Sequence, residues 1–91
     1  MKNTTTAINL PAEYALVLQL IEEDGEEDLG SLSRMLSISK GRLAVIVDAL
    51  RKKQLVVATQ TAYGDTWLRL TAKGRKLALY IWPEIAYQHA Y

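Results

Sequence analysis

The chain has 91 residues, of which 49% are hydrophobic and 23% are charged, and it contains no cysteine. This length predicts one domain over residues 1–91 with one modest core, and the lack of cysteine excludes disulfides and cysteine-ligated zinc. The formal net charge is only +1, yet residues 12–30 hold seven acids and no base, whereas residues 34–53 hold six bases and one acid. Such separation would orient the chain on a polyanion.

Localisation is predicted from what the sequence lacks. No stretch approaches the ~18 apolar residues of a membrane span, and the chain begins with threonines in place of the apolar core of a secretion signal. A chain without cysteine also suits a reducing compartment. We therefore expect a cytoplasmic protein with no membrane partner.

The first predicted element is a helix over residues 11–23. Pro11 suits the first turn of a helix, and Gly25 is typical of a left-handed stop. Acids at residues 22–24 occupy the end of the helix where its dipole disfavours them. They are therefore expected to serve solubility or a partner, not helix stability.

Residues 31–56 have the pattern of two short helices packed across a tight turn, which is the layout of a helix-turn-helix. The predicted helices cover residues 29–37 and 39–54, because apolar residues recur at helical spacing on both sides of an interruption at residues 38–39. Ser39 can cap the second helix. Lys40 and Arg42 then lie in its first turn, where a DNA-reading helix makes its closest approach.

The remaining elements are a hairpin and a final helix. Two β-rich runs at residues 55–61 and 66–70, joined by a turn at residues 62–65, predict a strand-turn-strand wing. Thr71 caps a helix over residues 71–82 that is apolar on nearly every side, so residues 71–91 are predicted to form a dimerisation segment. The expected homodimer interface comprises Leu10, Leu77, Tyr80, Ile81, Trp82, Ile85 and Tyr87.

The run from residue 31 to 56 and the segment LTAKGRKLA, residues 70–78, resemble the MarR-type winged helix-turn-helix transcriptional regulators, in a short variant. The resemblance covers roughly half of the chain. It implies an α+β fold, with a three-helix core, a β-hairpin wing and a C-terminal helix, in which residues 11–70 form the helix-turn-helix and wing. It also implies a homodimer that binds double-stranded DNA, with a small aromatic effector. The expected DNA-binding residues are Arg34, Ser39, Lys40, Arg42, Val45, Lys52, Tyr63 and Arg69.

Several positions depart from the pattern of that family. Ser37 and Gln54 replace two of its glycines, so both positions are expected to be strained or built differently. The wing turn carries no base for the minor groove, and Val45 stands where an arginine is frequent. Arg42 is thus expected to read a guanine edge, and Val45 to make contacts such as one with a thymine methyl group.

Two functions remain open. The leading one is sequence-specific DNA binding by a small dimeric regulator. The alternative is a winged-helix adaptor that binds a protein through Ala44, Val45 and Ala49. The bases at residues 51–53 fit phosphate contacts, and they fit equally a cationic last turn that complements the helix dipole.

The sequence supports neither catalysis nor cofactor binding. There is no serine, histidine and acid set at recognisable spacing and no phosphate-cradling glycine loop. The acids of residues 22–28 lack the spacing of a calcium loop, which favours a solvated connection, and His89 has no second ligand in view. Tyr80 and Trp82 are more typical of an interface or core than of a ligand pocket. We therefore predict a non-enzyme without metal or other cofactor.

Overall fold

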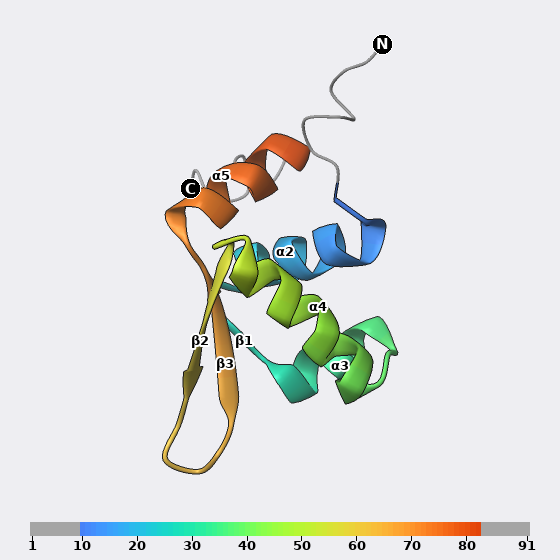
Figure 1. Ribbon diagram of the computed structural model, residues 1–91, viewed down its shortest axis with the longest axis vertical. Coiled ribbons are helices and arrows are strands. Elements are labelled where there is room, and N and C mark those ends of the chain that lie inside the picture. The colour runs from blue at the N-terminus through green and yellow to red at the C-terminus, as the bar shows by residue number, and fades with distance from the viewer. Residues whose placement is uncertain (1–9, 83–91) are drawn as a thin grey trace.

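The structure is a computed structural model and describes residues 10–82 (Figure 1). Its three strands form one antiparallel sheet in the order β1-β3-β2. Figure 1 shows the hairpin of β2 and β3 projecting at one end of the molecule, with α5 at the opposite end. In chain order the elements are α2 (Ala12–Asp24), β1 (Glu27–Asp28), α3 (Leu29–Leu36), α4 (Lys40–Lys52), β2 (Val56–Gln60), β3 (Thr66–Leu70) and α5 (Ala72–Ile81).

This architecture confirms the predicted α+β winged helix-turn-helix. The ends of the predicted helices and hairpin strands differ from the observed ones by no more than two residues. Only β1 was not expected. Glu27 and Asp28 pair with Leu68 and Trp67 of β3, and two acids carry no strand pattern.

The hydrophobic core lies where α2, α3 and α4 meet the sheet. Leu18 and Ile21 of α2 are fully buried there, and so is Leu68 of β3. The apolar face expected for the second motif helix is buried in full, because its 3.6-residue period points all of its members inward. Its members are Leu43, Ile46, Val47 and Leu50.

Side-chain caps begin three of the helices. The Asp28 carboxylate accepts a 2.7 Å hydrogen bond from the Ser31 amide at α3, and Ser39 Oγ accepts one of 3.0 Å from the Arg42 amide at α4. At α5, Thr71 Oγ1 accepts a hydrogen bond of 2.9 Å from the Gly74 amide. The predicted caps at Ser39 and Thr71 are confirmed.

The acidic run contains one error of prediction. Glu22 is only 6% exposed, and its carboxylate lies 3.2 Å from Arg75 Nε of α5, so its expected role in solubility or partner binding is wrong. Glu27 is also buried, and Asp28 caps α3, so residues 22–28 are not a simple solvated connection. Among residues 10–82, no helix combines the length and apolar character needed to cross a membrane.

The start of α5 is fastened to the turn that follows α4. Thr71 Oγ1 donates to the Gln54 carbonyl over 2.7 Å, and the Thr71 amide donates to the Leu55 carbonyl over 3.0 Å. Lys73 Nζ donates to the Lys53 carbonyl over 3.1 Å. A Cβ on Gly74 would lie 2.0 Å from the Leu55 oxygen, so only glycine permits this approach. These contacts fix where α4 ends and β2 begins.

Candidate nucleic-acid interface

The exposed side of α4 carries two chemically different rows of residues. Its outermost row, opposite the buried face, comprises Gly41, Val45, Asp48 and Lys52, because these residues recur at helical spacing and are all exposed. Val45 is 59% exposed, although it is aliphatic and lies mid-helix. Beside this row, Lys40 and Arg51 lie three turns apart on the side of the wing.

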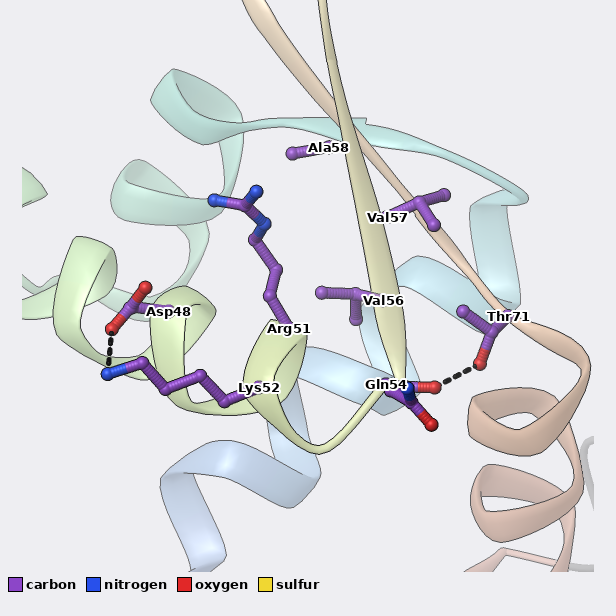
Figure 2. A pocket seen from close by; sticks show the side chains of 8 residues that line it. All are labelled: Asp48, Arg51, Lys52, Gln54, Val56, Val57, Ala58 and Thr71. Atoms are coloured by element: carbon purple, nitrogen blue, oxygen red, sulfur yellow. Dashed lines mark hydrogen bonds and ion pairs between the residues drawn. The ribbon is translucent and has the colours of Figure 1, made fainter.

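A groove separates α4 from the wing. It has a volume of about 630 Å³, and we call it the helix–wing groove. Figure 2 shows the Arg51 side chain rising from α4 on the same side of β2 as Val56 and Ala58, whereas Val57 points to the other side. Lys52 Nζ lies 3.1 Å from Asp48 Oδ2. The groove is lined by Asp48, Arg51, Lys52, Gln54, Val56, Val57, Ala58 and Thr71.

A second hollow brings the helix-turn-helix close to the tip of the wing. Its volume is about 370 Å³, and its lining includes Arg34 of α3, Lys40 of α4 and the turn residues Gly64 and Asp65. Arg34 Nη2 donates to Ser31 Oγ over 3.2 Å. Two predicted DNA-binding bases thus lie on the wing side of the motif.

Asp28 lies at the edge of the same hollow and is strongly hydrogen-bonded. The hydrogen bond from the Ser31 amide lowers the pKa of its carboxyl below the ordinary value of 3.8, and the Ser31 hydroxyl and the Arg34 charge add to the effect. Asp28 is therefore a charged cap in neutral solution, and it partly balances Arg34.

Arg42 lies on the other side of α4, facing α2. Its guanidinium forms an ion pair with Glu13 of α2, and the side chains are 57% and 44% exposed. The hydrogen bond to Glu13, together with the charge of that residue, raises the pKa of Arg42 above its ordinary value. The structure therefore turns the expected guanine-reading side chain toward an acid of its own chain.

The wing ends in a tight loop stabilised by one threonine. Thr61 Oγ1 accepts hydrogen bonds from the Tyr63 and Asp65 amides over 3.3 and 3.2 Å. Gly64 has a φ of +90°, which is typical of a three-residue hairpin loop closed by a glycine bulge. Tyr63 is 93% exposed at the tip.

Arg69 is separated from the other expected DNA-binding residues. Leu68 is buried toward the core, so its neighbours Trp67 and Arg69 occupy the opposite face of the sheet. Arg69 pairs with Val57 across the strands, and it lines a hollow of about 420 Å³ together with Trp67 and Thr59. Of the predicted set, Arg34, Lys40, Val45 and Lys52 share one side of the molecule, Arg42 faces α2, and Arg69 lies behind the wing.

Arg51 is absent from the predicted DNA-binding set, although the bases at residues 51–53 were already expected to fit phosphate contacts. Its place in the helix–wing groove follows from its register, because it lies eleven residues, or about three turns, after Lys40. The same spacing in the sequence could have favoured phosphate contact over a cationic last turn for this residue. Only the position of the wing explains why this side of α4 matters.

The expected dimer residues divide into three groups. Leu10 and Leu77 pack against the core of their own chain, which uses part of their apolar surface. Tyr80 is 56% exposed on α5, whereas Ile81 and Trp82 are half-buried. Ile85 and Tyr87 lie outside the described residues.

The sequence matches no protein-family model and no curated protein. Solved structures do resemble it. NadR in complex with 4-hydroxyphenylacetate is 26% identical, with a TM-score of 0.80 over 93% of this chain and 62% of that chain. A MarR-family transcriptional regulator from Rhodococcus sp. RHA1 is 21% identical, with a TM-score of 0.81 over 93% of this chain and 61% of that one.

Reduced AbfR bound to DNA has the same fold at 19% identity, with a TM-score of 0.78 over 91% of this chain and 61% of that chain. The chain therefore spans about three fifths of the length of these proteins. The fold and its geometry place the chain in the winged-helix class. The structural neighbours of the chain include MarR-family regulators.

Proposed function

We propose that the chain is a transcriptional regulator that binds double-stranded DNA through α4 and the wing. The observation that carries this proposal is the helix–wing groove, because Arg51 extends into it beside an exposed recognition helix. Lys40 and Arg34 extend the same basic side toward the wing tip. A structure of this fold, AbfR, was solved bound to DNA, which supports the proposal.

In the proposed complex, α4 enters the major groove with its outermost row against the bases. Lys40 and Arg51 contact phosphates along one strand, and these contacts fix the position of the helix without reading sequence. The wing carries no base at its tip, so Tyr63 touches the DNA backbone and does not enter the minor groove. Sequence preference then comes from α4.

We also propose that two copies of the chain assemble through α5. Tyr80, Ile81 and Trp82 leave apolar surface on α5, and Tyr80 is the most exposed of the three. A two-fold dimer would place two recognition helices about one DNA turn (~34 Å) apart, which predicts an inverted-repeat site. A small aromatic acid is the proposed effector, since NadR was solved with 4-hydroxyphenylacetate. Calorimetric titration of the chain with that acid tests this part.

The contribution of the groove can be tested with one pair of variants. Arg51→Ala should weaken binding to random-sequence duplex DNA several-fold, and it should make the slope of log K against log salt shallower by about 2, because each chain of the proposed dimer loses one phosphate contact. Lys76→Ala removes the same charge from an exposed position on α5 and should leave that slope unchanged. Fluorescence anisotropy over a range of salt concentrations measures both.

The same pair of variants distinguishes DNA binding from the adaptor function. If Arg51→Ala binds duplex DNA as the unmodified chain does, the groove is not a phosphate-binding surface. An unmodified chain that shows no affinity for duplex DNA would favour the adaptor, whose protein-binding face would use the exposed Ala44 and Val45 of α4.

A further inference from the structure

The part of α4 that would face the bases is aliphatic over its first two turns. Gly41, Ala44 and Val45 are all exposed, and none of them brings a side-chain hydrogen-bond donor or acceptor. Among the large aliphatic side chains of the described residues, Val45 is the most exposed, at 59%. Solvent is an unfavourable environment for such a group, so the helix would gain free energy if an apolar partner covered it.

The polar side chains around this aliphatic row are engaged within the protein. Arg42 is ion-paired with Glu13 of α2, and Asp48 is ion-paired with Lys52 one turn further along α4. Lys40 and Arg51 lie to the wing side, where the hollows between helix and wing suit the DNA backbone. The alkyl groups of Ala44 and Val45 are therefore the groups in the middle of α4 that remain to contact base edges.

We propose that Val45 determines sequence preference by packing against thymine methyl groups in the major groove. This inference rests on the proposed function. It specifies the preferred ligand, which is duplex DNA with thymine under the centre of α4. Thymine is distinguished in the major groove by its C5-methyl group, which accepts apolar contacts and which uracil lacks. Burying one such methyl group against Val45 should raise the affinity roughly threefold to fourfold.

The experiment compares the same DNA with and without those methyl groups. Random-sequence duplexes are enriched by rounds of binding to the unmodified protein, and the enriched pool is then synthesised with dTTP or with dUTP. Uracil retains the pairing with adenine and loses only the methyl group. The dissociation constant for the uracil pool should be at least about threefold higher than that for the thymine pool.

Two variants assign the effect to one side chain. Val45→Ala should bring the uracil-to-thymine ratio of dissociation constants close to one, and it leaves no internal cavity because Val45 is exposed. Leu16→Ala is the matched control. Leu16 is also an exposed aliphatic residue, at 42%, but it lies on α2 and lines neither the helix–wing groove nor the hollow at the wing tip, so this variant should keep the full ratio.

A ratio near one for the unmodified protein, or a ratio that survives in Val45→Ala, would overturn the inference. If no sequence is enriched although binding keeps its steep salt dependence, the inference is overturned while the proposed DNA binding stands. Failure of any duplex to bind would remove the proposed function together with the inference. An equal loss of the ratio in Leu16→Ala would contradict the assignment to Val45.

Discussion

Among the glycines of the described residues, Gly74 has the least space for a side chain. It lies in the first turn of α5, against the backbone of Leu55, where the turn after α4 passes into β2. Thr71 and Lys73 hydrogen-bond to the same turn. The LTAKG portion of the segment at residues 70–78 therefore has a physical explanation, which is the close approach of two backbones.

Gly74→Ala should lower the free energy of unfolding by about 3 kcal/mol, because the added Cβ would lie 2.0 Å from the Leu55 oxygen and must displace backbone. Gly41→Ala is the control. A Cβ there meets only Ser39 Oγ, at 4.0 Å, so this variant should gain roughly 0.5 kcal/mol from helix propensity. Urea unfolding followed by circular dichroism measures both. Equal stability of the two variants would refute the account of Gly74.

Single residues also show what the sequence could reveal. The expectation for Ser37 and Gln54 is confirmed, since their φ values are +56° and +62° in the left-handed region that favours glycine. The Ser39 and Thr71 caps were equally visible as local patterns. The pair of Glu22 and Arg75 was not, because it joins residues 53 positions apart. The pair of Glu13 and Arg42 was hidden for the same reason.

Individual elements were largely predictable because each has a strong local period. The face of α4 and the alternation of β3 follow from the spacing of apolar residues. β1 escaped prediction because it has only two residues, and both are acids, which carry no strand pattern. The candidate site was predicted in part, because the sequence identifies an exposed basic helix without revealing which side of it faces the wing.

The beginning of α3 depends on the charge of Asp28. Because the folded state lowers the pKa of this carboxyl, its contribution to stability is complete above the ordinary pKa of 3.8 and is lost as the pH falls through the folded value. Asp28→Asn retains a competent cap but no charge. It should therefore cost about 0.5 kcal/mol at about pH 7, and the difference should shrink at about pH 3.

Urea unfolding of both proteins at the two pH values tests this prediction. The unmodified chain and Asp28→Asn should converge in acid, because protonation removes the charge that distinguishes them. A difference that is independent of pH would show that the carboxylate charge does not stabilise α3.

The assembly of the whole molecule is testable through α5. At micromolar concentration, light scattering should report twice the chain mass of 10.2 kDa. Tyr80→Glu should give monomers, because it places a charge in the proposed interface. Tyr63→Glu makes the same exchange at the wing tip, where the tyrosine is 93% exposed, and should remain dimeric. A monomeric unmodified chain, or two variants of equal mass, would reject assembly through α5.

The central claim is that α4 and the basic side facing the wing bind the phosphate backbone of duplex DNA. The most direct measurement is a salt titration of the unmodified chain with random-sequence duplex DNA. Contacts from Arg34, Lys40 and Arg51 of both chains of the proposed dimer predict a slope of log K against log salt of about −5, since each of the six phosphate contacts contributes about −0.9. A flat slope, or no binding at low salt, would contradict the account.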